Sequence, residues 1–177
     1  MRIVGGKYKG RTLLSFSGDD IRPTADKVRE SLFNILQFDI YGRDFLDLFS
    51  GTGAMGIEAL SRGANKVVFN DLSKESLALL KKNLVKVKVE EKPQIKNLNA
   101  VTLLKTSTEQ FDIIYIDPPY KSRLGEECLK VVCSAVKDNG KVILEDEKAF
   151  EGNVEGLKIT DRRKYGRVHL TFFEKEN

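Results

Sequence analysis

A glycine-rich segment is the first place in the chain where residue types and spacing suggest chemistry. Residues 47–60 read DLFSGTGAMGIEAL, in which Gly51, Gly53 and Gly56 have the spacing G-x-G-x-x-G between an apolar run and a helical pattern. Such glycines allow a tight turn and let a ligand approach the backbone closely. A packing turn between a strand and a helix can have the same sequence. As a functional motif, the segment predicts a site for an adenosine-containing ligand, either NAD or S-adenosylmethionine.

Two carboxylates favour S-adenosylmethionine over NAD. Asp47 precedes Gly51 by four residues, where its charge would repel a pyrophosphate but attract the ammonium of a methionine group. Asp71 follows Gly51 by 20 residues, where it can accept hydrogen bonds from both hydroxyls of a ribose. The alternative for Asp71 is an acid at the start of a helix whose N-cap is Ser73.

A second motif, Asp117-Pro118-Pro119-Tyr120, follows another apolar run. Two prolines make a rigid, extended exit from a strand, so the Asp117 carboxylate and the Pro118 carbonyl can face one point. Two such acceptors can hold the exocyclic amine of a nucleobase toward a sulfonium methyl and stabilise the charge that grows on nitrogen. Asp117 can then accept the proton, and Tyr120 can stack on a base extruded from its helix. The alternative is a Pro-Pro loop with a surface tyrosine.

A parallel sheet is needed to bring these motifs together. Three β-rich runs, at residues 45–49, 66–70 and 111–116, are separated by helical patterns, which predicts βαβ units. The other expected elements are helices after Pro23, after Ser73 and over 125–137, a strand over 141–145, an antiparallel pair over 157–160 and 168–173, and a hairpin that joins residues 3–4 to 11–14.

Composition indicates one globular domain of 177 residues, with 41% hydrophobic and 32% charged residues. Cys128 and Cys133 are the only cysteines and His169 is the only histidine, so we expect neither a disulfide framework nor a metal site. The sequence has no run of 18 apolar residues and no export signal. We therefore expect a cytoplasmic monomer without a membrane partner.

Positive charge is concentrated at the two ends of the chain. Residues 1–30 carry seven basic and four acidic side chains, and residues 158–177 carry six and three, whereas the whole chain has a net charge of +4. Basic residues interleaved with small ones suit contact with phosphates, although an exposed basic hairpin without a partner gives the same pattern. The candidate RNA contacts are Arg2, Lys7, Lys9, Arg11 and Arg22.

These motifs together resemble the class I S-adenosylmethionine-dependent methyltransferases. Residues 1–11 (MRIVGGKYKGR), 22–24 (RPT) and 28–34 (VRESLFN) further resemble the bacterial 16S rRNA (guanine-N2)-methyltransferase D family, which modifies guanine 966 of the small subunit. The likeness covers nearly the whole chain. It implies transfer of a methyl group from S-adenosylmethionine to the N2 amino group of a guanine in 16S rRNA.

The resemblance also implies a fold and a set of site residues. The fold is an α/β, Rossmann-like, three-layer αβα domain over residues 1–177, with a basic N-terminal hairpin or arm (1–23) and a core (24–177). Its seven-stranded sheet is mostly parallel, with an antiparallel last strand. Taken alone, Asn99 would be a helix N-cap. Matched by position, the cofactor residues are Asp47, Ser50, Gly51, Gly53, Gly56, Asp71, Leu72, Asn99 and Ala100, and the catalytic residues are Asp117, Pro118, Pro119 and Tyr120.

Other functions remain open at this point. A DNA adenine-N6 methyltransferase uses the same tetrapeptide, but this chain has little room for a target-recognition region. A protein glutamine methyltransferase would favour Asn at position 117. A non-catalytic RNA-binding module and an NAD-dependent enzyme are further alternatives. Two segments also depart from the family pattern: residues 121–150 form a short rim, and residues 162–167 (RRKYGR) are unusually basic.

Overall fold

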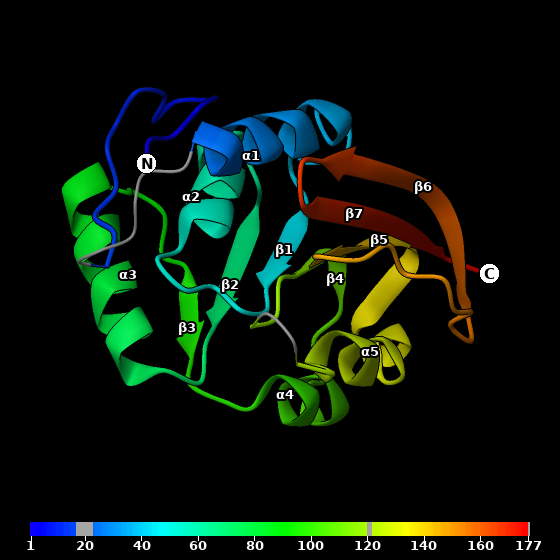
Figure 1. Cartoon of the computed structure of the whole chain (residues 1–177). Coiled ribbons are helices and arrows are strands. Elements are labelled where there is room, and N and C mark those ends of the chain that lie inside the picture. Colours follow the sequence, from blue (N-terminus) through cyan, green and yellow to red (C-terminus); the bar gives the residue numbers. More distant parts are fainter. Residues whose placement is uncertain (17–22, 120–121, 177) are drawn as a thin grey trace.

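Seven strands of one sheet form the centre of the computed structural model, which describes residues 1–16, 23–119 and 122–176. The strands are β1 (Asp44–Asp47), β2 (Lys66–Asn70), β3 (Gln94–Lys96), β4 (Phe111–Ile116), β5 (Val136–Asp146), β6 (Leu157–Tyr165) and β7 (Val168–Lys175). Their spatial order is β3-β2-β1-β4-β5-β7-β6, and β7 alone runs in the direction opposite to the other six strands (Figure 1). The mostly parallel sheet with a reversed last strand is confirmed.

Helices cover both faces of this sheet (Figure 1). One face carries α1 (Pro23–Ile35), α2 (Ala54–Ser61) and α3 (Lys74–Val87), and the other carries α4 (Ala100–Thr106), α5 (Leu124–Leu129) and the 3-10 helix η1 (Val132–Ala135). Successive strand residues point to opposite faces, so Phe45 joins one buried apolar cluster and Leu46 joins the other. Two separate cores therefore hold the three predicted layers together.

The predicted helix over 125–137 is wrong in its second half. It ends at Leu129, continues as η1, and gives way to β5 at Val136. Val136 pairs with Phe111 of β4, and the register then shifts, so that Lys141 pairs with Ile113. Asn139, expected to stop the helix, has its positive φ of 59° inside this irregular part of β5. Strand pairing by Val136 thus outweighs the local helical pattern.

The described part of the N-terminal arm, residues 1–16, reverses direction as predicted but forms no regular strands. Ile3 N donates to Arg11 O at 2.9 Å and Leu13 N donates to Met1 O at 3.0 Å, yet only one isolated bridge is present, between residues 2 and 12. Ile3 and Leu13 are buried in the core on the α1 side. Residues 1–16 of the arm are therefore packed onto the body of the domain.

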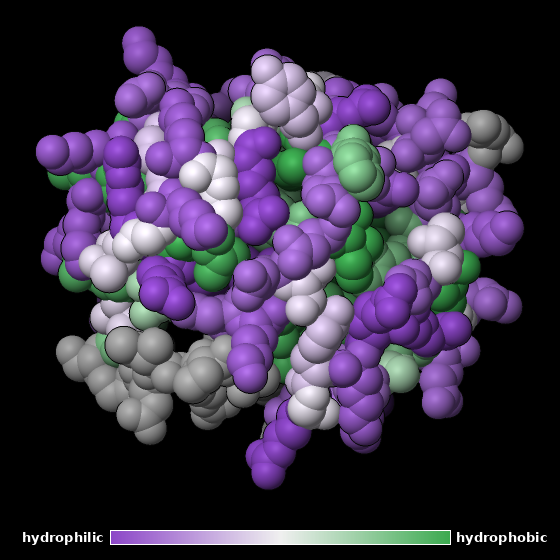
Figure 2. All heavy atoms as spheres, turned by 90° about the horizontal axis from the view of Figure 1, so that it is seen from above, coloured by the Kyte–Doolittle hydropathy of each residue, from purple (hydrophilic) through white to green (hydrophobic). Residues whose placement is uncertain are grey.

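The surface has few large apolar side chains. Figure 2 shows one face covered mostly by hydrophilic residues, with hydrophobic groups visible between them. Among the large exposed apolar residues are Leu72 and Leu98, which lie in the loops that follow β2 and β3 at the carboxyl edge of the sheet. Within the described part of the chain, no helix combines the length and apolar character needed to cross a bilayer.

Candidate active site

The glycine-rich loop connects the end of β1 to the start of α2. Gly53 is the N-cap of α2 and has a φ of 84°, and Gly51 has a φ of 50°. A Cβ on Gly53 would lie 2.2 Å from Leu80 Cδ1, and one on Gly56 would lie 2.2 Å from Phe69 Cε1, whereas no atom lies within 4 Å of the corresponding position on Gly51. Gly53 and Gly56 thus permit close packing, while Gly51 faces open space that a ligand can enter.

Asp47 ends β1 beneath this loop and is only 1% exposed. Its Oδ2 accepts a hydrogen bond from Gly56 N at 2.9 Å, but its Oδ1 and the nearby Ser50 Oγ are buried without a hydrogen-bond partner among the described residues. Burial raises the pKa of Asp47 to about 7, although the Gly56 amide opposes the shift. A buried carboxylate in this state lacks a cation, and a ligand ammonium group would supply one.

Asp71 ties the same loop to the end of β2. Its Oδ2 accepts from Gly51 N at 2.8 Å, and its Oδ1 accepts from Ser73 N at 2.8 Å. Ser73 in turn caps α3, as predicted, by accepting from Ser76 N at 3.2 Å. Asp71 therefore stabilises the start of α3, which is one of its two expected roles. It also lines a cleft and has lone pairs that hydroxyl groups can still use, so binding of a ribose stays a prediction.

A cleft of about 580 Å³ opens between the loops after β2 and β3 and the turn after β4. We call it the α4 cleft. Asn99 caps α4 by accepting from Thr102 N at 3.1 Å, as its residue type alone predicts, and it also lines the cleft. Leu72, which is 68% exposed, provides an apolar wall. The α4 cleft brings together predicted residues from three strand ends, namely Asp71, Leu72, Asn99, Ala100, Asp117, Pro118 and Pro119.

A second cleft of about 630 Å³ adjoins it across the end of β1, and Phe49 and Asp117 line both. We call this one the β7 cleft, because residues 166 and 167 of the β6–β7 turn and Val168, the first residue of β7, form one side of it. Asp47, Ser50 and Gly51 line it together with Asp117. One extended ligand can therefore contact Asp71 in the first cleft and Asp47 in the second. Arg22 and Tyr120, two other predicted site residues, lie outside the described residues.

Asp117 follows β4 directly and is partly buried at the junction of the two clefts. Its pKa is raised well above the usual range, first because burial disfavours the charged form and then because Glu145, Asp47 and Asp146 are negatively charged neighbours. A carboxylate with a raised pKa is a stronger proton acceptor once it is ionised. Pro118 is buried and Pro119 is exposed, so only the first of the two prolines is packed against the body of the domain.

Two functional candidates, Tyr115 and Glu145, are not among the predicted site residues. The Tyr115 hydroxyl donates a hydrogen bond to Glu145 Oε2, and both side chains line the β7 cleft. Burial raises the pKa of Glu145, although the Tyr115 hydroxyl opposes the shift. The available signal was strand alternation: Tyr115 lies two residues before Asp117, on the same face of β4, and Glu145 is the last residue of the run predicted over 141–145.

The basic arm uses two of its predicted RNA contacts internally. Lys7 Nζ lies 2.7 Å from Glu91 Oε1 and 3.2 Å from Glu90 Oε2, and hydrogen bonding to Glu91 is the main reason that the pKa of Lys7 is raised. The Arg11 guanidinium donates to the carbonyl of Val87 at the end of α3. Arg2 and Lys9 are exposed. Arg167, which was not a predicted contact, lines the β7 cleft.

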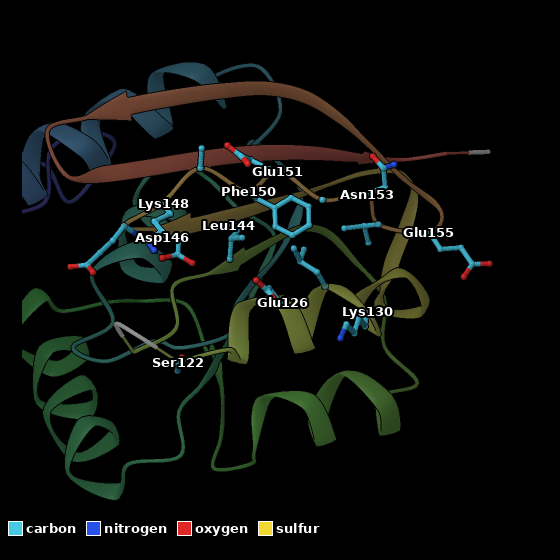
Figure 3. A pocket seen from close by; sticks show the side chains of 15 residues that line it. Ser122, Glu126, Lys130, Leu144, Asp146, Lys148, Phe150, Glu151, Asn153 and Glu155 are labelled. Carbon is cyan, nitrogen blue, oxygen red and sulfur yellow. Dashed lines mark hydrogen bonds between the residues drawn. The ribbon is translucent and has the colours of Figure 1, made fainter.

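A third and larger cavity, of about 960 Å³, lies between α5 and the loop from β5 to β6 (Figure 3). Phe150 forms part of its wall and contacts Phe173 edge to face, with ring centroids 5.5 Å apart. Its charged side chains are mostly acidic: Glu126, Asp146, Glu147, Glu151 and Glu155 against Lys130 and Lys148. This cavity is thus poorly suited to phosphate contact.

Comparisons with known proteins agree with this architecture. The family described as "Conserved hypothetical protein 95" matches residues 1–174. Ribosomal RNA small subunit methyltransferase D of Haemophilus influenzae is 38% identical, over 84% of this chain and 79% of its own length. The protein of the same name from Escherichia coli is 36% identical, over 88% and 76%. The solved structure of Escherichia coli yhhF superposes with a TM-score of 0.86 at 31% identity and covers 99% of this chain and 98% of that one.

Proposed function

The chain belongs to the family described as conserved hypothetical protein 95, and from this premise we propose that it is an S-adenosylmethionine-dependent rRNA methyltransferase. Its substrate is 16S rRNA of the small ribosomal subunit, and it methylates the N2 amino group of a guanine of the 966 type. One observation supports this most strongly: Asp47, which has a buried carboxylate oxygen without a hydrogen-bond partner in the described part of the chain, lines the same cleft as Asp117.

The residues present fit S-adenosylmethionine. Its ammonium would pair with Asp47 Oδ1, and its carboxylate would accept from Ser50 Oγ and the loop that contains Gly51. Its ribose hydroxyls would donate to Asp71, and its adenine would lie among Leu72, Asn99 and Ala100. Gly53 and Gly56 act indirectly, because they let α2 pack closely enough to hold the loop in place. When bound, this cofactor supplies a methyl group on a positively charged sulfur.

The chain's own residues prepare the acceptor. The Asp117 carboxylate and the Pro118 carbonyl accept hydrogen bonds from the guanine amine and hold its nitrogen toward the methyl group. Transfer of the methyl group from the sulfonium to this nitrogen would leave the nitrogen positively charged, and these two acceptors would stabilise that charge. The amine proton then passes to Asp117 or to water. Pro119 stiffens the turn, and Tyr120 supplies the stacking surface for the extruded base.

RNA binding draws on the basic N-terminal arm in this proposal. Lys9 and Arg2 of the arm are exposed, whereas Lys7 and Arg11 must exchange contacts with Glu91 and Val87 before they can bind phosphate. Changing Lys7, Lys9 and Arg11 together to Ala should weaken RNA binding and flatten its salt dependence, because fewer counterions are released. Cofactor affinity should stay unchanged. Unaltered RNA methylation at moderate salt would remove the arm, and with it Arg2 and Arg22, from the substrate site.

The alternative acceptors are less well supported. Asp117 stands where a protein glutamine methyltransferase favours Asn, and only a short rim follows the catalytic turn. We also propose that residues 1–177 act as one domain, with a basic N-terminal arm (1–23) and a Rossmann-like core (24–177), and that the enzyme is a cytoplasmic monomer that needs no metal.

The test is to map the product. Small subunits that lack the modification are incubated with the protein and labelled S-adenosylmethionine, and the labelled nucleotide is located and hydrolysed for mass spectrometry. We expect N2-methylguanosine at one position. N6-methyladenine as the product would favour the adenine alternative, and absence of label would reject an enzymatic role on this substrate.

A further inference from the structure

A pair of acids, rather than Asp117 alone, faces the acceptor side of the β7 cleft. Ile116 of β4 pairs with Leu144 of β5 in parallel register, so the next residues, Asp117 and Glu145, stand side by side at the carboxyl edge. Adjacent strands lie about 4.8 Å apart. Both side chains line the β7 cleft, and the negative charge of Glu145 is one reason that the pKa of Asp117 is raised.

Tyr115 fixes the orientation of the Glu145 carboxylate in the β7 cleft. Its hydroxyl donates to Glu145 Oε2, and no described residue donates a hydrogen bond to Oε1. Tyr115 is itself 2% exposed and is held beside Asp47, its register partner on β1. A buried hydroxyl that donates to one carboxylate oxygen leaves the other oxygen free to accept from a ligand. Asp47 lines the same cleft, and its Oδ1, which accepts no hydrogen bond from the residues that the structure describes, is available to a ligand.

Guanine carries two neighbouring donors that match two neighbouring acceptors. Its N2 amine and its N1–H lie next to each other on one edge, and both donate. Adenine differs, because the ring nitrogen next to its N6 amine is an acceptor and would point a lone pair at a second carboxylate. A site that makes a hydrogen bond to one base therefore leaves a buried group unpaired with the other.

We propose that Glu145 is the residue that selects guanine: its free carboxylate oxygen accepts a hydrogen bond from guanine N1–H while Asp117 accepts from the N2 amine. Tyr115 is a positioning residue that acts through Glu145. The inference rests on the proposed function, since it concerns the acceptor base of the same reaction. It adds a specificity determinant on β5, which none of the predicted catalytic residues supplies.

The test compares two acceptor RNAs that both carry a 2-amino group. One has guanine at the target position and the other has 2-aminopurine, in which N1 is an acceptor without a hydrogen. We expect the wild-type enzyme to prefer guanine by about 100-fold in kcat/KM, the range for a lost buried hydrogen bond that leaves its partner unpaired. Glu145→Gln should reduce this ratio to below about 3-fold, because its amide can donate to the N1 acceptor.

Two further variants separate selection from folding. Tyr115→Phe removes only the hydroxyl and should leave a ratio of about 10-fold, since Glu145 is still present but no longer oriented. Glu151→Gln, an exposed acid on the neighbouring loop, removes the same charge as Glu145→Gln and should keep the wild-type ratio. Thermal melting of each variant with S-adenosylhomocysteine reports whether the fold and the cofactor site survive.

The outcomes are distinguishable. If the wild-type enzyme methylates neither RNA, the proposed function fails. If it methylates guanine at N2 but Glu145→Gln leaves the preference at its wild-type value, or lowers both rates equally, the proposed function stands and the role of Glu145 is rejected. Equal wild-type rates on the two RNAs reject it as well. Recovery of the 2-aminopurine rate in Glu145→Gln supports it, because a merely structural role would not produce a gain.

Discussion

The two adjoining clefts differ in how their acids are satisfied. In the α4 cleft, both carboxylate oxygens of Asp71 accept backbone hydrogen bonds, from Gly51 and Ser73. In the β7 cleft, Asp47 has a buried oxygen without a partner among the described residues, and the pKa of Asp117 is raised by burial and by the negative charges of Glu145, Asp47 and Asp146.

This difference separates an acid that stabilises the fold from acids that the fold tolerates. Backbone hydrogen bonds to a carboxylate stabilise both the charge and the loop that supplies them. Buried acids without a cation destabilise the ligand-free protein, and such groups persist where binding or chemistry requires them. Neutralising an acid should therefore have opposite effects on stability in the two clefts, while it impairs function in both.

The largest effect is expected at Asp117. Asp117→Asn keeps one acceptor for the guanine amine but removes the proton acceptor, so kcat should fall by about 10²–10⁴-fold. The affinity for S-adenosylhomocysteine, measured by calorimetry, should change much less. Asp138→Asn, an exposed acid at the opposite end of β5, is the matched control and should keep the wild-type kcat. A normal rate in Asp117→Asn would contradict the mechanism.

The next effect is expected at Asp47, where function and stability should move in opposite directions. Asp47→Asn should weaken S-adenosylhomocysteine binding by about 10–100-fold, because it removes a charged hydrogen-bond partner. The pKa of Asp47 is raised from 3.8 to about 7 in the folded state, so the folded protein binds this proton more tightly than the unfolded chain does. Its contribution to the free energy of unfolding therefore falls as pH rises through this window, and the destabilisation is complete above pH 7.

Asp47→Asn should accordingly be more stable than the wild type at pH 8, by of the order of a few kcal/mol, and the gain should shrink toward pH 4. Asp44→Asn, at the other end of β1, provides the contrast. Burial there favours a raised pKa, but Lys137 and Asn65 outweigh it and lower the pKa of Asp44, so that variant should lose stability at pH 8. Thermal melting of the ligand-free proteins at pH 8 and at pH 4 measures the stability change in both variants. Destabilisation of both variants alike would refute the contrast.

The pH dependence of cofactor binding should be smaller, about tenfold. Binding of an ammonium group requires ionised Asp47, which is mostly protonated at pH 6 and mostly ionised at pH 8 when its pKa is about 7. The affinity for S-adenosylhomocysteine should therefore be about tenfold weaker at pH 6 than at pH 8. The slope should disappear in Asp47→Asn. An equal slope in that variant would assign the pH dependence to another group.

The smallest effect is expected in the α4 cleft. Asp71→Asn keeps an acceptor for one of its two amides, so we expect a loss of about 3–10-fold in cofactor affinity and of about 1 kcal/mol in stability. The sign matters more than the size, because this variant should be destabilised at pH 8 where Asp47→Asn is stabilised. If Asp71→Asn is also stabilised, the two clefts do not differ in the way described.

Much of the fold was predictable because local signals and tertiary pairing agree there. The runs over 66–70 and 111–116 are β2 and β4 as observed, and Ser73 caps α3. The structure of the segment after Leu129 was not predictable, because its apolar residues can be buried equally well in a helix or in a strand. The pairing of Val136 with Phe111 decides in favour of a strand. Strand β3 is a short edge strand with the sequence QIK, which carries no clear alternation.

The candidate site divides in a similar way. Residues within one motif, such as Asp47 with Gly51, were recognisable because strand, loop and helix are contiguous. The partnership of Tyr115 and Glu145 joins two strands across 30 residues, and only the register of β4 with β5 brings them together. The ion pair of Lys7 with Glu91 could not be predicted either, because the two residues are far apart in the sequence and only the fold brings them together.

A crystal structure with S-adenosylhomocysteine bound is the most direct test of how donor and acceptor share the two clefts. We predict the adenosine in the α4 cleft with its ribose hydroxyls on Asp71, the ammonium on Asp47, and the sulfur facing Asp117 across a space wide enough for one base. An ammonium group bound away from Asp47, or a sulfur turned from Asp117 toward solvent, would contradict the account.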